Sequence, residues 1–206
     1  MDVSLYVEVP FCAFRPYASR EYQDTYPIPP PSAVYGMLLS LVGVRREDKT
    51  LHCGVEMGLA VEKLPKQAKV FRKLRRGKTL QDLRPDYQDL LLDLHLWIWL
   101  RPGHDTAPVS LPDRVVQVLS SPASVTRFGG LSLGESSYLV DTIAVKGPPE
   151  REGIFLQPDG QGFHSLPVWV DHQDALKTLL QRFTLVSRSL RGGLEGCWVE
   201  IPLPAA

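Results

Sequence analysis

Residues 14–43 read FRPYASREYQDTYPIPPPSAVYGMLLSLVG, and this stretch organises the first half of the chain. Its prolines between residues 27 and 31 hold the backbone extended and predict a helix that begins directly afterwards, over residues 32–42. Gly43 is a suitable residue to end that helix. The apolar side chains that share one face of the helix are Val34, Leu38, Leu41 and Val42.

Strand patterns lie on both sides of this helix. Residues 3–14 are largely apolar, and residues 55–61 alternate with the two-residue period of a β-strand. A longer strand is predicted over residues 90–101, whose two faces differ in character. One face carries Leu90, Leu92, Leu94, Leu96, Ile98 and Leu100, and the other carries Asp93, His95, Trp97, Trp99 and Arg101.

A second helix over residues 112–119 and a fourth strand over residues 138–145 complete the pattern. The order strand, helix, strand, strand, helix, strand predicts an α+β fold. It is the ferredoxin-like βαββαβ arrangement found in RRM-like RNA-binding domains. We expect this domain to span residues 1–146.

The remaining residues, 147–206, begin with a Gly-Pro-Pro joint and change in composition. They predict a smaller C-terminal β-rich subdomain, with its own small sheet packed on the first domain. A helix is expected over Asp174–Arg182. Short strands are expected near residues 153–156, 166–170 and 197–201.

The composition favours a soluble protein. The 206 residues are 44% hydrophobic, and 23 basic side chains balance 23 acidic ones. The 18 prolines and 16 glycines disfavour a plain helical bundle. No apolar run reaches the about 20 residues that span a bilayer, and the N-terminus lacks the cationic start of a signal peptide. We therefore expect a cytoplasmic protein that makes no contact with a membrane.

The neutral total hides a strongly basic segment over residues 63–78, KLPKQAKVFRKLRRGK. It contains eight basic residues and no acidic one, so the rest of the chain has 15 basic against 23 acidic residues, a net charge of −8. This asymmetry predicts a localised contact with a polyanion, made by a projecting hairpin or a flap. A solvated loop without a ligand is the alternative.

Neither metal nor cofactor chemistry is indicated. The three cysteines are far apart and form no CxxC pair, which favours small buried hydrophobes over a disulfide or zinc site. The five histidines show no metal-binding spacing. Residues 130–134 fit the G-x-S-x-G pattern, but a strand rather than a helix follows it, so a serine hydrolase is disfavoured.

The glycine-rich loop over residues 127–137, RFGGLSLGESS, has another possible use. Glycines let backbone N–H groups approach phosphates closely, and neighbouring hydroxyl and cationic side chains can complete such a contact. An ordinary turn is the alternative. Trp97 and Trp99 lie on an adjacent strand and either stack on RNA bases or form core beneath the C-terminal sheet.

Two of these segments resemble a known family. The stretch quoted at the start, and FGGLSLGESSYLV over residues 128–140, are similar to motifs of the Cas-five family of CRISPR-associated proteins, within the RAMP superfamily. The resemblance implies a non-catalytic subunit of a type I CRISPR surveillance complex (Cascade). Such a subunit binds the 5′ handle of the CRISPR RNA (crRNA) and caps the complex's backbone. It implies contacts with a backbone subunit of the Cas-seven family and with the large subunit, and indirect contact with target DNA near the PAM.

The resemblance also suggests which residues bind RNA. The family's basic hairpin, the thumb, corresponds to about residues 64–88. No catalytic, metal or cofactor residue is implied. The RNA-binding candidates are Arg15, Tyr17, Arg20, Lys69, Arg72, Lys73, Arg75, Arg76, Arg127, Gly129, Gly130, Ser132, Gly134 and Ser136.

Two alternatives stay open. One branch of the family cleaves precursor crRNA with a tyrosine, lysine and histidine set, which has no counterpart that we can map onto this chain. A metal-independent endoribonuclease would use His95 or His52 as its histidine. The tyrosine of such a nuclease would be Tyr17, Tyr22, Tyr26 or Tyr35.

The other alternative is a purely structural cap whose basic run meets acidic protein surfaces.

Overall fold

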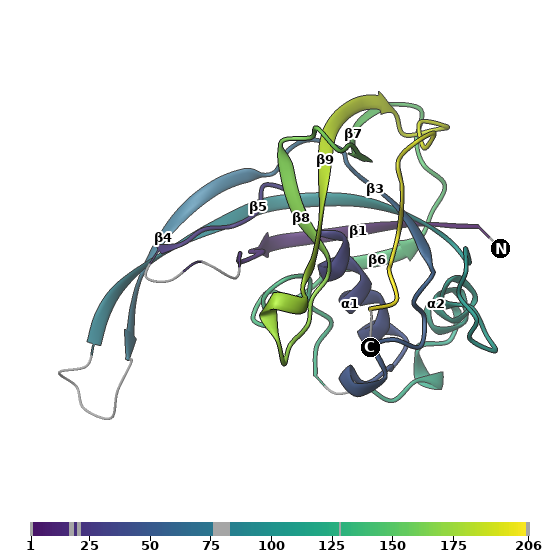
Figure 1. The fold of residues 1–206 in the computed structure, drawn as a ribbon, viewed down its shortest axis with the longest axis horizontal. Coiled ribbons are helices and arrows are strands. Elements are labelled where there is room, and N and C mark those ends of the chain that lie inside the picture. The colour runs from purple at the N-terminus through teal and green to yellow at the C-terminus, as the bar shows by residue number, and fades with distance from the viewer. Residues whose placement is uncertain (1, 17–18, 20–21, 76–82, 128, 205–206) are drawn as a thin grey trace.

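The computed structural model describes residues 2–16, 19, 22–75, 83–127 and 129–204, with residues 72–75 and 83–85 described through their backbone alone. Over these residues the chain combines two α-helices with one large, mainly antiparallel sheet (Figure 1). The strands are β1 (Val3–Cys12), β2 (Tyr22–Gln23), β3 (Glu56–Val61), β4 (Lys66–Arg75), β5 (Leu83–Arg101), β6 (Thr142–Val145), β7 (Glu152–Pro158), β8 (His164–Trp169), β9 (Leu179–Ser189) and β10 (Trp198–Glu200). The helices are α1 (Pro31–Leu41) and α2 (Leu111–Ser120), with short 3-10 turns at Arg46–Asp48, Pro122–Ser124 and Ala175–Lys177.

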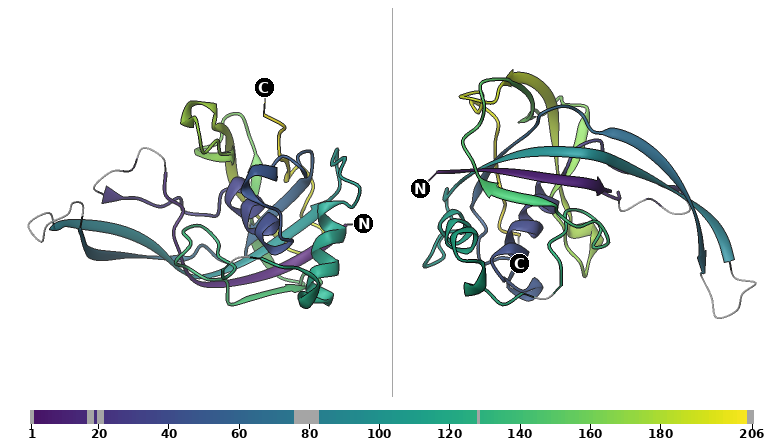
Figure 2. Two further views of the ribbon diagram at one scale, coloured as in Figure 1. Left: turned by 90° about the horizontal axis from the view of Figure 1, so that it is seen from below. Right: turned by 180° about the vertical axis from the view of Figure 1, so that it is seen from behind.

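Four strands are neighbours in the order β6-β1-β5-β3, and each neighbouring pair is antiparallel. β6 lies at the edge of the sheet, and β1, β5 and β3 are its central strands. Both helices pack on one face of these strands (Figure 2). The strands and helices predicted over the first 146 residues are confirmed, although the fourth strand begins at Thr142 rather than Tyr138. Residues before it instead form a turn in which the Tyr138 N–H donates to the Glu135 carbonyl.

The helix boundaries follow from local chemistry. Pro30 is extended and leads into α1, and Gly43 follows the helix with φ = +74°, a conformation that glycine adopts without strain. The predicted apolar face of α1 is fully buried. At α2 the Ser110 side chain accepts a hydrogen bond from the Asp113 N–H and caps the first turn.

Strand β5 changes its buried face at Asp93, where φ = +60°. From Leu94 to Leu100 the even-numbered side chains enter the core as predicted. Before Asp93 the alternation is lost: Leu91 joins the core, and Leu90 is buried as predicted, but Leu92 is only half-buried, so the prediction that it continues the core face is wrong. A left-handed residue rotates the strand, and the period of two therefore breaks at this point.

Beyond this kink, β4 and the first half of β5 form an antiparallel hairpin that projects away from the rest of the molecule (Figure 1). The pairing runs from Lys66 opposite Leu92 to Arg75 opposite Leu83. A projecting hairpin was one of the two predictions for the basic segment, the other being a flap, and the structure shows the hairpin. The short strand β2 lies against the same part of β5 in a parallel pairing.

The C-terminal strands extend the same sheet. Ala60 and Val61 of β3 pair with β7, which is followed by β9 and β8, and β10 pairs with the opposite end of β3. The expectation of a separate C-terminal sheet is therefore wrong. The curved β7-β9-β8 segment brings β8 over α1, where Trp169 lies against Tyr35 with ring centroids 6.5 Å apart (Figures 1 and 2).

The helix expected over Asp174–Arg182 is also wrong. The Asp174 side chain caps a single 3-10 turn, and β9 begins at Leu179. Leu176 and Leu180 have helical spacing, but they are 94% and 59% exposed, so a helix here would have no apolar face to bury. Pairing of β9 with both β7 and β8 satisfies its backbone instead.

Two hydrophobic clusters lie on the two faces of the sheet. The larger one joins the central strands to both helices and to β8. The smaller one, on the other face, contains Trp97, Trp99 and Phe155. Both tryptophans are more than nine-tenths buried, so the hypothesis that they stack on RNA is wrong. Within the described residues, neither helix has the length and apolar character to cross a lipid bilayer.

Candidate nucleic-acid interface

Three segments that are distant in sequence meet where the hairpin leaves the sheet. They are the Arg15 segment (residues 13–26), the base of the hairpin and the glycine-rich loop (residues 127–137). Gln88 Nε2 on β5 donates to Glu135 Oε1 at 2.8 Å, and the Glu135 N–H donates to the Ala13 carbonyl at 3.3 Å. These contacts place predicted RNA-binding residues from all three segments in one region.

The hairpin base holds an unusual group of buried polar side chains. Gln23, Asp86, Gln88 and Asp89 are each less than 9% exposed. Gln23 Nε2 donates to Asp86 Oδ2 at 2.9 Å. The Tyr22 hydroxyl donates to the Asp89 carboxylate at 3.0 Å, and Gln67 Nε2 donates to its other oxygen at 3.0 Å. These bonds fasten β2, and with it the Arg15 segment, to the hairpin.

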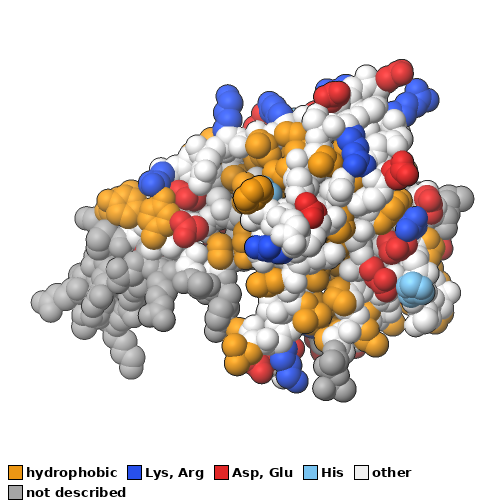
Figure 3. Space-filling model, turned by 45° about the horizontal axis from the view of Figure 1, so that its top comes forward, with side chains coloured by type: hydrophobic (Ala, Val, Ile, Leu, Met, Phe, Trp, Pro, Cys, Tyr) orange, Lys and Arg blue, Asp and Glu red, His pale blue; other side chains and the backbone are white. Residues whose placement is uncertain are grey.

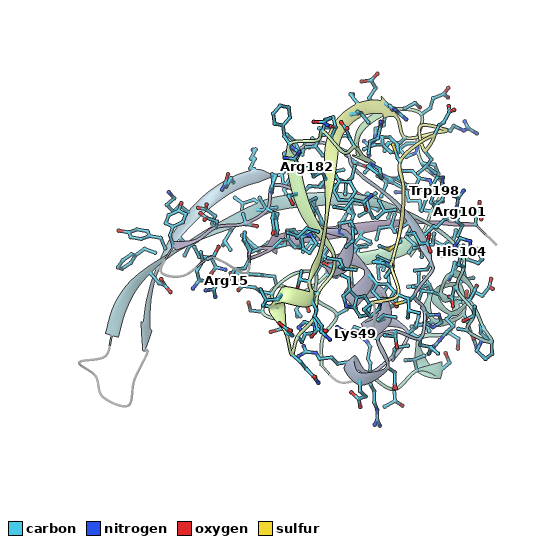
Figure 4. The ribbon with its side chains drawn as sticks, in the orientation of Figure 1. Arg15, Lys49, Arg101, His104, Arg182 and Trp198 are labelled. Atoms are coloured by element: carbon cyan, nitrogen blue, oxygen red, sulfur yellow. The ribbon has the colours of Figure 1, made fainter. Side chains whose placement is uncertain are left out.

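Hydrogen bonds fix the described ends of the Arg15 segment, and Arg15 itself is labelled in Figure 4. The Phe14 N–H donates to Thr25 Oγ1 at 2.9 Å, and the Tyr26 N–H donates to the Phe14 carbonyl at 3.0 Å. Arg15 is exposed and its Nη2 donates to the Ser19 carbonyl at 2.8 Å. Tyr17 and Arg20, the other candidates from this segment, lie outside the described residues.

The glycine-rich loop is anchored by Leu131 and Leu133, both buried. Gly134 has φ = +88°, and a Cβ at this position would overlap the Ala13 carbonyl oxygen. Packing of the loop against Ala13 therefore requires glycine at position 134, independently of any ligand. The predicted contact residues on its surface are exposed, apart from half-buried Ser132; they are Arg127, Gly129, Gly130, Gly134 and Ser136.

Among the predicted cations of the hairpin, Lys69 is the one whose side chain the structure describes. Lys69 is exposed, and its Nζ lies 4.7 Å from the centre of the Tyr22 ring. The pKa of the Lys69 ammonium lies above its ordinary value, chiefly because of a hydrogen bond with the Tyr22 hydroxyl, so Lys69 stays cationic. Arg72, Lys73 and Arg75 lie on β4, whose backbone alone is described there. Arg76 lies outside the described residues.

Sequence reasoning missed an aromatic pair on the hairpin. Phe71 and Tyr87 are 52% and 47% exposed, and their rings meet edge to face with centroids 5.5 Å apart. The hydrophobic side chains at the base of the hairpin form a visible group (Figure 3). The two residues are 16 positions apart, and only the hairpin register, which the sequence did not specify, makes them neighbours.

Apart from Tyr17, which lies outside the described residues, the candidate nuclease residues are held in structural contacts. His52 is fully buried and lies between Asp105 Oδ2 at 2.8 Å and Arg114 Nη1 at 3.0 Å. Tyr35 is buried as well and donates to the Lys49 carbonyl, while burial raises the pKa of Tyr26. Tyr22 is bound to Asp89.

His95 is the more accessible of the two histidines, with a quarter of its side chain exposed. The hydrogen-bond partner of its Nδ1 is the Tyr6 hydroxyl at 2.6 Å, and none of the sequence hypotheses named Tyr6. Burial and a hydrogen bond to Glu8 raise the pKa of Tyr6, which opposes formation of a phenolate. Across the described part of the chain, no three His, Cys, Asp or Glu side chains gather as a metal site would require.

A family model described as CRISPR-associated protein (Cas_Cas5) matches residues 3–117. The CRISPR-associated protein Cas5 of Myxococcus xanthus (strain DK1622) is 38% identical over 182 residues, which cover 82% of this chain and 83% of that protein. The chain belongs to the Cas5 family. The resemblance recognised in the two sequence motifs is therefore confirmed, and the matched region includes the Arg15 segment and the whole hairpin.

Solved structures support the Cas5 fold. A chain of a "CRISPR RNA-guided surveillance complex" superposes with a TM-score of 0.68 at 13% identity, covering 94% of this chain and 92% of the other. A second structure, "Crystal structure of Cas protein", gives a TM-score of 0.50 at 15% identity and covers 93% and 95% of the two chains. At these identities the similarity is one of fold.

Proposed function

We propose that this Cas5 protein binds the 5′ handle of crRNA and caps the backbone of a type I CRISPR surveillance complex without cutting RNA. The observation that carries the proposal is the meeting of the Arg15 segment, the hairpin base and the glycine-rich loop in one region. Each contributes exposed groups suited to RNA phosphates or bases. The surveillance-complex chain with the same fold gives the setting.

The proposal includes a ferredoxin-like core. The strand order β6-β1-β5-β3 corresponds to 4-1-3-2 in a βαββαβ unit, with all neighbours antiparallel and both helices on one face. In this unit the hairpin extends the second and third strands. We assign residues 1–146 to this domain and residues 147–206 to a subdomain that covers it.

Charge supplies affinity, and shape supplies specificity. Cations on β4 and Arg15 would neutralise handle phosphates and release counterions, which makes binding depend on salt. The glycine-rich loop would support the RNA backbone through its exposed N–H groups. The partly buried hydrogen bonds from Tyr22 and Gln67 to Asp89 hold these groups in place before RNA arrives, which reduces the entropy lost on binding.

The implied partners follow from this role. The hairpin would also pack against the neighbouring Cas-seven-type backbone subunit and the large subunit, and the protein would meet target DNA near the PAM only indirectly. A cytoplasmic location fits that assembly. The endoribonuclease alternative is weaker, because His52 is inaccessible and the raised pKa of Tyr6 makes it a poor partner for His95 in base catalysis.

Guide retention across a salt titration tests the proposal. The variant reverses the charge of the candidate cations, and the control reverses two exposed arginines outside the interface, Arg45 and Arg191. We expect the interface variant to bind handle-containing single-stranded RNA more weakly and with a shallower salt slope, by about 0.7 for each phosphate that is no longer neutralised. The residues changed are Arg15, Arg20, Lys69, Arg72, Lys73, Arg75 and Arg76.

Equal retention by the interface variant and the control at every salt concentration would contradict the proposal. Cleavage is tested separately by incubating the protein with repeat RNA in EDTA. We expect intact RNA. Cutting at one position that His95→Ala abolishes would establish the nuclease instead.

A further inference from the structure

Phe71 on β4 and Tyr87 on β5 are directly opposite each other in the hairpin, so both side chains stand on the same face. About half of each residue's surface is exposed, and the two rings meet edge to face rather than stacked face to face. Large aromatic side chains in this position contribute little to the core. An exposed, preorganised pair of rings is therefore a candidate binding surface.

The next residue pair along the same face is Lys69 and Asp89, about 7 Å closer to the body of the protein. Here Tyr22, Gln67, Ala68, Lys69 and Asp89 line an open hollow of about 310 Å³. Lys69 supplies a positive charge at its rim. An aromatic surface and a cation are thus adjacent on one side of the hairpin.

The exposed aromatic rings and the neighbouring cation together indicate which kind of ligand binds here. Single-stranded nucleic acid presents a flat base beside a charged phosphate, and proteins bind it with aromatic rings interleaved with cations. The strand that carries Phe71 has five basic residues among its ten, so its charge matches a polyanion. Phe163, which is 97% exposed, is followed instead by β8, a strand without lysine or arginine.

We propose that Phe71 and Tyr87 form a platform that stacks on an unpaired base of the bound RNA, while Lys69 contacts the adjoining phosphate. This inference rests on the proposed RNA-binding function and deepens it. Because stacking uses the face of a base, the platform holds any base and fixes where the RNA strand crosses the hairpin.

The probe is a single-stranded oligoadenylate in which one adenine at a time is replaced by the fluorescent analogue 2-aminopurine. Its emission falls when the base stacks on an aromatic ring. Full-length protein is compared with Phe71→Leu and Tyr87→Leu, which keep apolar bulk but remove the ring. Phe163→Leu is the matched control on a different part of the surface.

We expect quenching at one position in the protein and in the Phe163→Leu control, and loss of that quenching in Phe71→Leu and Tyr87→Leu. Affinity should fall about tenfold in each platform variant. The salt slope should stay unchanged, since the charge is the same, whereas Lys69→Ala should make it shallower by about 0.7.

Other outcomes overturn the inference in distinguishable ways. Tight RNA binding by Phe71→Leu and Tyr87→Leu, with quenching intact or never present, removes the platform and leaves the proposed function standing. Normal RNA affinity with failed incorporation into the assembled complex shows that the platform binds a protein subunit. Absence of RNA binding by the unaltered protein at low salt contradicts both proposals.

Discussion

At the scale of single residues, Gly134 shows why the glycine-rich loop has its sequence. A side chain at Gly134 would meet the Ala13 carbonyl oxygen and approach the Phe14 ring at 3.1 Å, and φ is +88°. Gly134→Ala should therefore lower the free energy of unfolding by about 1–3 kcal/mol. Urea denaturation measures this change.

Two other glycines separate the causes of that loss. Gly129 has φ = +75°, and a Cβ added there would have no atom within 4 Å, so Gly129→Ala isolates the backbone strain. Gly147 is open and has an ordinary φ, so Gly147→Ala should leave stability unchanged. If Gly134→Ala were as stable as Gly147→Ala, the close approach to Ala13 would have no energetic consequence.

Asp93 gives a prediction about protonation. Lys63 Nζ lies 2.9 Å from Oδ2 and His95 Nε2 lies 2.8 Å from Oδ1, and these contacts lower the pKa of Asp93 below 3.8, with Lys63 the largest cause. The stabilisation is therefore present above pH 3.8 and is lost as the pH falls through the lowered pKa. Lys63→Met should raise the pKa towards 3.8.

NMR titration of the side-chain carboxyl carbon measures that shift. Lys66→Met, a few residues away on β4, is the control and should leave the Asp93 titration where it is. An Asp93 pKa that Lys63→Met does not move would show that the ion pair at the kink is absent in solution.

At the scale of elements, the attachment of β2 to the hairpin depends on a few buried bonds. Tyr22→Phe keeps the ring beside Lys69 but removes the hydroxyl that donates to Asp89. Leaving a buried carboxylate with one donor fewer costs about 1–3 kcal/mol. We expect faster amide hydrogen exchange at the hairpin base, with the central strands unaffected.

Tyr87→Phe is the matched control, because Tyr87 lies next to Tyr22 in the β2–β5 pairing and is half exposed. It should leave exchange at the hairpin base unchanged. Identical exchange in Tyr22→Phe and the unaltered protein would mean that the Gln23 bond to Asp86 and the pairing of β2 with β5 are enough to hold β2 in place.

Elements could be predicted from sequence where one local pattern decides them. The prolines before α1 and the alternation from Leu94 to Leu100 were sufficient, since nothing distant competes with them. The pattern failed at Asp93, where one left-handed residue reverses the faces of β5, and over residues 174–182, where pairing with β7 and β8 determines the structure.

The candidate site was predictable only in part for a related reason. Its cations and glycines share short motifs, and those motifs identified the family. Phe71 and Tyr87, Tyr22 and Asp89, and Gln88 and Glu135 become neighbours through strand register and chain folding over 16 to 67 residues. Sequence spacing alone holds no information about such contacts.

At the scale of the whole molecule, the C-terminal residues cover both sides of the first 146. On one side β8 places Trp169 over α1, next to Tyr35. On the other, Phe155, Leu190 and Cys197 close over the tryptophans of β5. The Glu62 carboxylate, which accepts from Trp97 Nε1 at 3.1 Å, also contacts the Arg151 guanidinium. Residues 147–206 therefore complete the core of residues 1–146 as well as extending their sheet.

A protein truncated to residues 1–146 should consequently fail to fold cooperatively. Exposing one large apolar side chain costs about 1.5–3 kcal/mol, and Tyr6, Trp97, Trp99 and Tyr35 would become exposed together. That loss approaches the stability of a whole domain, about 5–15 kcal/mol.

Thermal unfolding followed by near-ultraviolet circular dichroism, with binding of a hydrophobic dye, measures the effect of the truncation. Removing only residues 203–206, where Leu203 is 71% exposed, is the control and should preserve the transition. Co-expression with residues 147–206 should restore it, whereas a sharp transition in the truncated protein alone would show two independent domains.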